Sequence, residues 1–381
     1  MKLRSLVLLA VTSAALLAAG RAEPARRPRY GGTLRVEIGA TVNSIDPSVA
    51  PQTEQEALAR DEICSLLYEP YRPQSECAGA AGTGAFRIVE WEPGKHLTLE
   101  ANPNYLGGRA FVDSVEIQMG RTARDRLLDL EMDKADIVEI PPEEARRASQ
   151  RGLHVTVSRP DELVALVFVP HHGVSGNLQV REALSRSIDR AAIVNFILQK
   201  DGEPAGGLLP QWCSGTAFLF PTAVDVAAAK TLWAQVTGSP GIVLGYDANY
   251  SLEQAIAERI AVDAREAGGL VIAAARKAGA SDHEDARIVR LGMASSNPSE
   301  ALARLIAVLS PMTGVDADPP PVEAAPQQVH EAERAIVSSF RIVPLVWMPR
   351  TYGLSTRVRD WKAPGPGEAW PFADVWLEDA P

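Results

Sequence analysis

The residues most suited to chemistry form two short runs of metal-binding side-chain types. Asp282-His-Glu-Asp285 and His171-His172 offer the imidazole and carboxylate groups that bind zinc or nickel. Side chains of adjacent residues point in different directions, so four neighbours rarely converge on one ion. We therefore interpret residues 282–285 as a solvated acidic loop or helix start, and we predict neither a metal site nor a bound cofactor.

Patterns typical of common catalytic sites are absent from the sequence. No Gly-x-Ser-x-Gly elbow occurs, and Gly173-Val-Ser-Gly lacks the required spacing. No Gly-x-x-x-x-Gly-Lys-Ser/Thr loop occurs, which excludes ATP hydrolysis of that type. Paired carboxylates such as Glu143-Glu144 are typical of an exposed helix surface. We therefore assign no catalytic residues and predict that the protein is not an enzyme.

The composition indicates a folded protein rather than a nucleic-acid binder. The 381 residues are 46% hydrophobic and 23% charged, which is typical of globular proteins, and the length allows two or three domains. The formal net charge is −10 and the isoelectric point is about 5.3. Nucleic-acid binding requires clustered Lys and Arg, so we predict no nucleic-acid partner.

The first 22 residues have the features of a secretory signal peptide. Met1-Lys-Leu-Arg4 is basic, residues 6–19 are apolar, and Gly20-Arg-Ala22 offers small residues at a cleavage site. A buried N-terminal helix is the alternative, but the flanking residues favour export. Arg21 stands where a lipoprotein signal would need cysteine, so we predict a soluble periplasmic protein without a lipid anchor.

Three cysteines, Cys64, Cys77 and Cys213, fit an exported protein in which disulfides can form. Cys64 and Cys77 are the pair closest in sequence, and the odd count leaves at least one cysteine without an intrachain partner. No Cys-x-x-Cys motif occurs, so we expect no metal site on these thiols.

Strand-like and helix-like spacings alternate along the chain and predict an α/β architecture. Strands are predicted over residues 31–38, 86–89, 97–99, 112–119, 136–140, 155–157, 163–169, 241–245 and 341–347. Helices are predicted over residues 53–68, 123–132, 180–191, 191–198 and 327–338, after Pro141-Pro142, and two or three times between residues 225 and 309. Asp189 is the expected N-cap of the helix over 191–198.

Several segments match one protein family in the same order along the chain. They are Gly31-Gly-Thr-Leu-Arg-Val, Asn43-Ser-Ile-Asp-Pro, Leu67-Tyr-Glu-Pro, Gly82-Thr-Gly-Ala-Phe, Glu100-Ala-Asn-Pro-Asn-Tyr, Val180-Arg-Glu-Ala-Leu-Ser-Arg-Ser-Ile-Asp and Ile342-Val-Pro-Leu-Val-Trp. Together they resemble the bacterial extracellular solute-binding proteins of family 5, the peptide-, dipeptide- and nickel-binding components of ABC importers. The match covers most of residues 31–200 and the C-terminal end, and it is weak between residues 205 and 325.

The resemblance implies a two-lobed periplasmic-binding-protein fold of class II type, with ligand held between the lobes. It implies a discontinuous first lobe, residues 31–173 and 341–381, and a second lobe, residues 174–340. The hinge is expected near residues 170–177 and 340. The tail tryptophans should then pack on the first lobe; they are Trp361, Trp370 and Trp376.

The resemblance also implies that a domain is missing. Many family members carry a small inserted domain between a Leu-Tyr-Glu motif and the Gly-Thr-Gly-x-Phe hairpin. Here Leu67-Tyr-Glu and Gly82-Thr-Gly-Ala-Phe are almost adjacent, and Cys64 and Cys77 bracket the junction. The chain therefore resembles a shortened form that lacks this domain.

The function implied by the resemblance is that of a monomeric solute-binding protein. It would capture a small-molecule or peptide ligand by closing about a hinge and deliver it to an ABC permease in the inner membrane. One alternative is a degenerate, non-transport family member that acts as a structural or sensory partner. Another is an exported metal-dependent hydrolase, which only residues 282–285 support.

Candidate ligand-binding residues lie on both expected lobes. Ligands of α/β sheets bind beyond the carboxyl ends of strands, and family members use the loop after the first strand; a loop held by its own hydrogen bonds is the alternative. The candidates are Thr41, Val42, Asn43, Ser44, Trp212, Ser295, Ser296, Asn297 and Trp347.

Weak binding of ordinary peptides is a further expectation. Peptide-binding relatives pair the ligand's amino group with an Asp that precedes a Pro in an aromatic-rich segment. The best match here, Gly292-Met-Ala-Ser-Ser-Asn-Pro298, is neutral and has no aromatics. Asp282 or Glu284 could compensate if they face the cleft. The alternative interpretation of Ser295-Ser-Asn-Pro is a helix N-cap.

Overall fold

The computed structural model describes most of the chain. The described residues are 27–46, 48–49, 51, 53–68, 82–170, 173–214, 220–236, 238, 241–248, 250–276 and 284–378. The expected signal peptide, His171-His172, Cys77 and Asp282 lie outside them. Within the described ranges, no helix is both long and apolar enough to cross a membrane.

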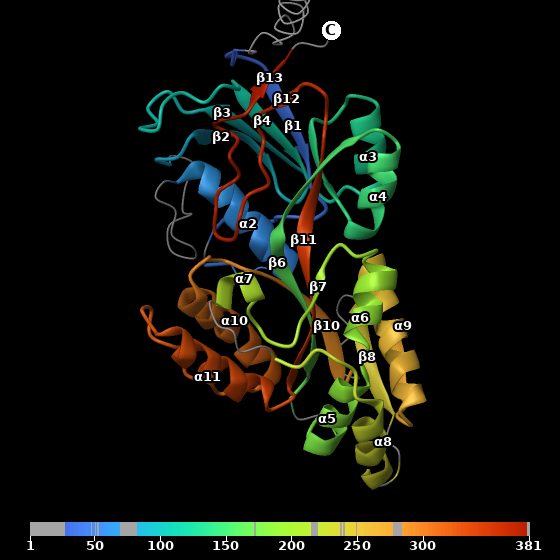
Figure 1. Ribbon diagram of the computed structural model, residues 1–381. Helices are drawn as coiled ribbons and strands as arrows, with labels where there is room; N and C mark the ends of the chain where they lie inside the picture. The colour runs from blue at the N-terminus through green and yellow to red at the C-terminus, as the bar shows by residue number, and fades with distance from the viewer. Residues whose placement is uncertain are drawn as a thin grey trace, which may run out of the picture.

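The protein has two lobes (Figure 1), and the first contains segments from both ends of the described chain. Before the crossing to the second lobe it comprises β1 (Thr33–Glu37), α2 (Glu54–Leu67), β2 (Phe86–Glu92), β3 (His96–Ala101), β4 (Ser114–Gln118), α3 (Ala123–Glu131), β5 (Ile137–Ile140) and α4 (Pro142–Gln150). After the return it gains β12 (Val358–Arg359) and β13 (Trp376–Leu377). The first lobe is therefore discontinuous.

The second lobe is one continuous stretch of chain. It comprises α5 (Leu178–Ser187), α6 (Arg190–Ala192), the π-helix Ile193–Ile197, β7 (Glu203–Pro204), α7 (Gln211–Ser214), α8 (Val226–Gln235), β8 (Ile242–Asp247), α9 (Ser251–Glu266), β9 (Val271–Arg276), β10 (Ala286–Gly292), α10 (Pro298–Thr313) and α11 (Pro326–Val337). Side-chain caps begin several of these helices: Asp189 accepts from Ala192 N, as predicted, and Asp225 accepts from Ala228 N.

Two long strands, β6 (His154–Phe168) and β11 (Ile342–Leu354), run through both lobes as an antiparallel pair (Figure 1). They join one sheet in the order β2-β3-β4-β1-β5-β11-β6-β10-β8-β9. Residues 351–354 of β11 pair with β5 of the first lobe, whereas residues 162–168 of β6 pair with β10 of the second. The crossing between lobes therefore lies in the middle of both strands.

Each lobe has its own apolar core. The first-lobe core gathers α2 and strands β1 to β4, and it includes Trp361 and Trp370 of the tail, as the sequence predicts. A smaller cluster lies under α3 and α4. In the second lobe, α5, α8 and α9 cover one face of the sheet, while α10 and α11 cover the other.

Three predictions about elements are wrong in detail. The strands predicted over 155–157 and 163–169 form the single strand β6, which continues through Pro160. The predicted helix over 191–198 is an α-helical turn followed by the π-helix. Strands β9 and β10 were not predicted, because β9 is rich in Ala and β10 carries two Arg residues.

The two sequence landmarks that flank the expected deletion meet in space. Gly84 N donates a hydrogen bond of 2.8 Å to the carbonyl oxygen of Leu67, the last residue of α2. Cys64, also on α2, is disulfide-bonded, and Cys77, the cysteine closest to it in sequence, lies outside the described residues. Cys213 is a buried free thiol in the described part of the chain.

Candidate functional site between the lobes

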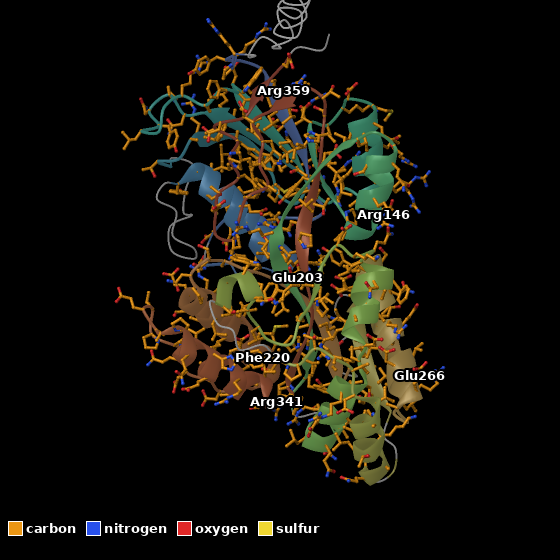
Figure 2. All side chains as sticks on the ribbon, in the orientation of Figure 1. Arg146, Glu203, Phe220, Glu266, Arg341 and Arg359 are labelled. Atoms are coloured by element: carbon orange, nitrogen blue, oxygen red, sulfur yellow. The ribbon has the colours of Figure 1, made fainter. Side chains whose placement is uncertain are left out.

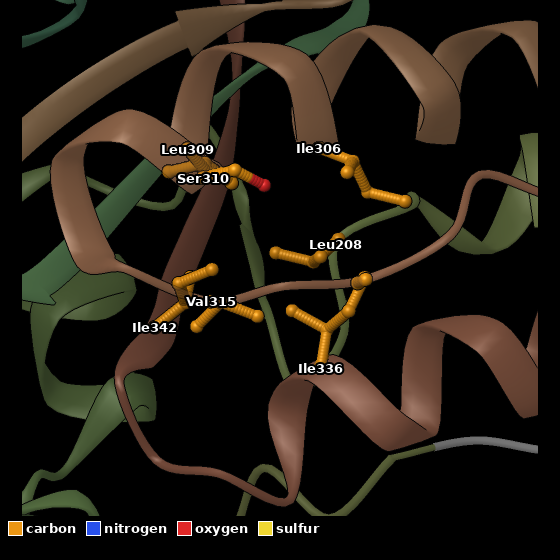
Figure 3. A pocket seen from close by; sticks show the side chains of 8 residues that line it. Leu208, Ile306, Leu309, Ser310, Val315, Ile336 and Ile342 are labelled. Carbon is orange, nitrogen blue, oxygen red and sulfur yellow. The ribbon is translucent and has the colours of Figure 1, made fainter.

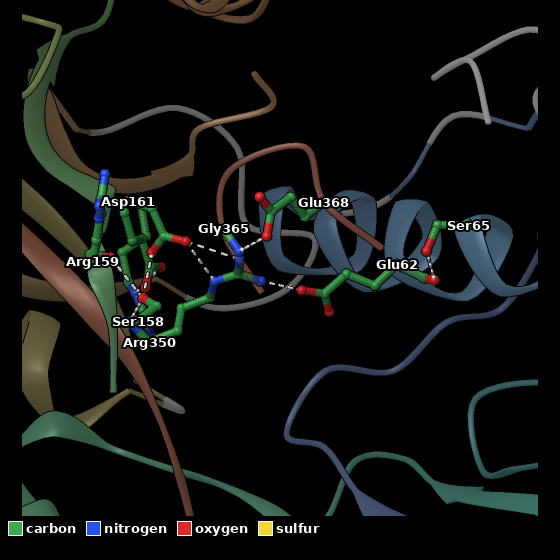
Figure 4. Close-up of polar contacts among 10 residues, drawn as sticks. Glu62, Ser65, Ser158, Arg159, Asp161, Arg350, Gly365 and Glu368 are labelled. Atoms are coloured by element: carbon green, nitrogen blue, oxygen red, sulfur yellow. Dashed lines mark hydrogen bonds and ion pairs between the residues drawn. The ribbon is translucent and has the colours of Figure 1, made fainter. Parts of the chain in front are cut away.

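An arginine joins the two strands and a helix at the place where the chain crosses between lobes (Figure 4). The Arg350 guanidinium donates to Asp161 of β6 through Nε (3.1 Å) and Nη2 (2.8 Å), and to Glu62 of α2 through Nη1. The backbone N of Arg350 donates to Ser158 Oγ at 2.9 Å. Glu62, Asp161 and Arg350 thus form one ion network at the crossing.

Backbone irregularity coincides with this network. The register of β6 and β11 shifts between Met348 and Pro349 and again between Pro349 and Thr351, and Pro349 pairs with Pro160. Proline lacks a backbone N–H and cannot donate to the sheet. Fewer hydrogen bonds therefore stiffen the two strands here than in stretches where every residue can donate. A further register shift lies between Pro344 and Val346.

Burial raises the pKa values of both acids in the network. It raises the pKa of Glu62 to about 7, against the lowering effect of Arg350 and with further raising by Glu139 and Asp161. Burial likewise raises the pKa of Asp161, which is 2% exposed. The Arg350 guanidinium forms ion pairs with two carboxylates, those of Glu62 and Asp161, and Glu139 is a third acid nearby.

A second ion pair lies on the second-lobe side of the cleft. Arg290 of β10 binds Glu162 of β6 through two hydrogen bonds of 2.7 and 2.9 Å. Its guanidinium lies 5.2 Å from the ring centre of Tyr250, and burial raises the pKa of Tyr250 to about 12. Tyr250 precedes α9 and interacts electrostatically with Glu139 of the first lobe, so charges of both lobes meet here.

The lobes also touch directly. A Cβ atom added to Gly292 of β10 would overlap the side chain of Leu58 on α2. One added to Gly367 would lie 2.5 Å from the carbonyl oxygen of Ala294. Glycine is therefore needed at both positions for the lobes to approach this closely.

A third contact joins helix α4 to the end of the π-helix. Arg146, labelled between the lobes in Figure 2, donates to the carbonyl oxygen of Gln199 at 3.1 Å. Gln199 and Lys200 both have positive φ, 52° and 77°, which is unusual for residues other than glycine. This strained turn (residues 199–200) lies against the first lobe.

The predicted site residues of the first lobe, Thr41 to Ser44, lie in one loop beside α2. Both the backbone N and Nδ2 of Asn43 donate to Glu56 Oε1, at 2.9 and 3.1 Å. Val42 is buried, and its carbonyl oxygen accepts from Gly94 N. Thr41 is exposed, and Ser44 Oγ accepts from Asp46 N. The two hydrogen bonds from Asn43 to Glu56 therefore attach this loop to helix α2.

The predicted site residues of the second lobe form another group. Asn297 caps α10 by accepting from Ser299 N and Glu300 N, which confirms the N-cap interpretation. Ser295 Oγ binds Glu300, and the carbonyl oxygen of Ser296 lies 3.6 Å from Cys213 Sγ.

The two predicted tryptophans have different surroundings. Trp212 donates from Nε1 to the carbonyl oxygen of Pro160 at 2.9 Å, which places it at the strand crossing. Trp347 is 2% exposed and packs into the second-lobe core under α10 and α11. A role in ligand contact remains a prediction for both groups of residues and for both tryptophans.

An apolar hollow lies away from this region, between α10 and α11 (Figure 3). It has about 180 Å³ of space between atoms and no room for a water molecule. Its lining residues are Leu208, Ile306, Leu309, Ser310, Val315, Ala317, Ile336 and Ile342. We interpret it as a packing gap in the second-lobe core.

Of the two compensating acids considered from sequence, Glu284 is paired within the second lobe. Glu284 forms ion pairs with Arg276 and Arg287, and Asp282 lies outside the described residues. Among the residues that the structure describes, no group of three or more His, Cys, Asp or Glu side chains is arranged to hold a metal ion.

Sequence reasoning missed the ion network itself. Glu62 and Arg350 are 288 positions apart, and no spacing rule links them. The available signal was the strand beginning at Ile342: continued past Trp347, it delivers Arg350 and Tyr352 to the crossing.

A family model matches residues 71–295, more than half of the chain; it describes bacterial extracellular solute-binding proteins, family 5, middle region. The chain belongs to this family. Its members are exported binding proteins of transport systems, and the two-lobed fold and discontinuous first lobe described above agree with that membership.

Curated family 5 relatives match parts of the chain. The oligopeptide-binding protein AppA of Bacillus subtilis is 27% identical over 146 residues, which are 38% of this chain and 26% of AppA. The probable D,D-dipeptide-binding periplasmic protein DdpA of Escherichia coli is 28% identical over 165 residues, 42% of this chain and 32% of DdpA. The matched stretch spans a third or less of each relative.

Solved structures of family 5 proteins share the fold over more of the chain. DppA from Helicobacter pylori, in complex with the peptide STSA, has a TM-score of 0.72 at 14% identity, covering 92% of this chain and 99% of DppA. NikA from Staphylococcus aureus, in complex with Ni(L-His)2, has a TM-score of 0.63 at 18% identity, covering 80% and 71%. At these identities the likeness is one of fold.

Proposed function

We propose that the protein is a periplasmic solute-binding protein that captures a small solute between its lobes and delivers it to an ABC permease in the inner membrane. The observation that carries this proposal is the pair of strands β6 and β11, which alone cross between the lobes among the described elements. Two crossings interrupted at Pro160 and Pro349 suit a hinge, and ligand would shift the open and closed populations.

The proposal includes the domain organisation expected from the sequence. Residues 1–22 are a signal peptide without lipid attachment. The sequence places the lobe boundaries at residues 173 and 341, so that residues 31–173 and 341–381 form the first lobe and residues 174–340 the second; we move these boundaries to Pro160 and Pro349, because Leu163 to Phe168 and Ile342 to Met348 contribute to the second-lobe cores. We place the hinge itself at the paired prolines, because the partners of both strands change there. The protein acts as a monomer and is not an enzyme.

A ligand panel tests this function. Purified mature protein is heated with peptides, sugars, amines and metal chelates, and the midpoint of unfolding is measured. A solute that binds only the folded state raises the midpoint, by about 2.7 kcal/mol of stability at one hundred times its dissociation constant. Stabilisation by one chemical class supports the proposal, and no stabilisation by any class contradicts it.

A degenerate, non-transport role is the second candidate. The direct contacts of Leu58 with Gly292 and of Gly367 with Ala294 favour it, because side chains and backbone of the protein itself fill the space between lobes there. A protein of this kind would keep one compact shape in small-angle X-ray scattering at every ligand concentration. A solute-binding protein would change its radius of gyration on saturation.

A further inference from the structure

Three polar side chains on one face of the first lobe border the ion network. Tyr352 of β11 pairs with Glu139 of β5 in the antiparallel register, and cross-strand partners lie about 5 Å apart on the same face. Tyr352 belongs to the core on the α2 side of the sheet, where Ile63 lies. Glu62 also belongs to α2, and it interacts electrostatically with both Glu139 and Tyr352, so its carboxylate lies near these two side chains.

The hydroxyl of Tyr352 is unsatisfied. Tyr352 is 2% exposed, and its Oη has no hydrogen-bond partner among the described residues. It interacts electrostatically with Arg350, Glu62, Glu139 and Asp161, so these four charged groups lie near the hydroxyl. Buried polar atoms nearly always have partners in native proteins. A group from outside the chain would supply the one that is missing.

The charged groups around this hydroxyl carry one net negative charge when all of them are ionised. Glu62, Glu139 and Asp161 contribute three carboxylates, and the facing guanidinium groups are Arg350 and Arg126. Arg350 binds Asp161 and Glu62, whereas Arg126 donates to the backbone oxygen of Glu139. Glu139 Oε2 accepts from Gly39 N at 2.9 Å. The ionised group is therefore one positive charge short of neutrality.

We propose that Glu62, Glu139 and Tyr352 form a subsite for the ammonium group of the bound solute. An ammonium has three donors and no acceptor, which matches two carboxylates and a phenol oxygen. A metal ion fits less well, since no cluster of three or more acidic, His or Cys side chains suited to one occurs in the described ranges. Glu62 and Glu139 are only partly buried, so each keeps some exposure to solvent.

This subsite rests on the proposed function and names its ligand class as primary amines. The neutral segment at Ser295 to Asn297 cannot supply a charge to such a group, and Glu284 is paired elsewhere. The first-lobe subsite makes a second-lobe acid unnecessary for a small amine. Burial that raises the pKa of Glu62 to about 7 predicts tighter amine binding as pH rises from about 6 to 8, because Glu62 then ionises.

The experiment is calorimetric titration of the mature protein with butylamine and with 1-butanol at about pH 8. A charged hydrogen bond is worth roughly ten- to hundred-fold in affinity. We expect the amine to bind at least about tenfold more tightly than the alcohol. Equal affinity for the two probes overturns the subsite.

Two variants and a control locate the effect. Tyr352→Phe removes a hydroxyl without a described partner, so the unfolding midpoint should stay or rise while amine affinity falls about tenfold. Glu62→Gln should lower amine affinity by a similar factor. Glu100→Gln, at an exposed position of strand β3, should change nothing. Unchanged amine affinity in both Tyr352→Phe and Glu62→Gln overturns the proposal.

The outcome also separates this subsite from the proposed function. If a neutral or anionic solute of the panel stabilises the protein and amines do not, the ammonium subsite is wrong and solute binding stands. If no solute of any charge binds, both are wrong. If the amine binds and both variants weaken it, both are supported.

Discussion

Arg350 makes polar contacts with three residues at the crossing between the lobes. Its side chain neutralises Asp161 and part of Glu62, and its backbone binds Ser158. Removing one partner from a buried ion network leaves the other charges without compensation, which costs more than the network contributes when complete. The position is therefore sensitive to substitution.

Replacing Arg350 with methionine should lower the free energy of unfolding by about 3–5 kcal/mol, because Asp161 and Glu62 lose their counter-charge. Urea denaturation measures the change. The matched control is Arg147→Met, which removes an exposed ion pair with Glu144 and should cost under about 1 kcal/mol. Similar losses in the two variants would contradict the assigned importance of the crossing network.

Glu333 of α11 gives a pH dependence. It is 2% exposed, its carboxylate accepts from Leu208 N and Leu209 N, and burial raises its pKa from 4.5 to about 7. The folded protein then holds this proton longer than the unfolded chain does, so stability falls as pH rises from about 4.5 to 7.

Glu333→Gln should remove that part of the pH dependence, which amounts to at most about 3 kcal/mol at 1.36 kcal/mol per pKa unit. Urea denaturation at about pH 5 and pH 8 measures the slope. Glu331→Gln, exposed on the same helix, should keep the slope of the unaltered protein. An unchanged slope in Glu333→Gln would show that Glu333 titrates normally.

At the scale of elements, the approach of α2 to β10 depends on the absence of a side chain at Gly292. Leu58 lies where a Cβ of residue 292 would be. The backbone of Gly292 does not have positive φ, so a larger residue would meet a steric obstacle and not a conformational one.

Gly292→Leu should therefore push α2 away from β10 and open the lobes, with a larger radius of gyration in small-angle X-ray scattering. Lys230→Leu is the control, because Lys230 is exposed on α8, away from the contact between the lobes. If Gly292→Leu keeps the radius of the unaltered protein, Leu58 has moved aside and the contact does not hold the lobes together.

Local sequence patterns predicted the first lobe better than the second. The hairpin of β2 and β3 and the helices α2, α3 and α4 lie close to their expected ranges, since apolar spacing and Pro-Gly turns are local signals. Strand β10 looks charged in sequence, and only the partner Glu162 shows why Arg290 can be buried. The continuous strand β6 could not be predicted, because a proline such as Pro160 is typical of a strand end.

The site shows the same limit. The loop at Thr41 to Ser44 and the segment at Ser295 to Asn297 could be proposed because each is a short contiguous motif. The ion network brings together α2, β6 and β11, which are distant in sequence. A pairing across such distances follows from the tertiary fold and has no counterpart in local spacing.

For the whole molecule, the direct contacts between lobes bear on ligand size. Leu58 meets Gly292 and Gly367 meets Ala294, so the protein's own atoms fill the space between the lobes at these two places. The neutral residues Ser295, Ser296 and Asn297 add no charge there. We therefore expect a compact ligand rather than a long peptide.

Calorimetry with dipeptides to pentapeptides should accordingly show no sub-micromolar affinity, and affinity should fall with peptide length. A buried charged hydrogen bond to the amine would be worth roughly ten- to hundred-fold, which is too little to keep the lobes apart for a long chain. Tight binding of a pentapeptide that disappears when its amine is acetylated would contradict this prediction.

The hydrogen bond from Gly84 N to the Leu67 carbonyl oxygen has an evolutionary consequence. Leu67 and Gly84 lie side by side in the first lobe, so a folded unit with neighbouring ends can be gained or lost between them without rearranging any strand. The same geometry offers a grafting point: a fluorescent protein inserted between Tyr68 and Gly82 would be carried by α2, the helix that contacts both Arg350 and Gly292, and its emission could report lobe movement.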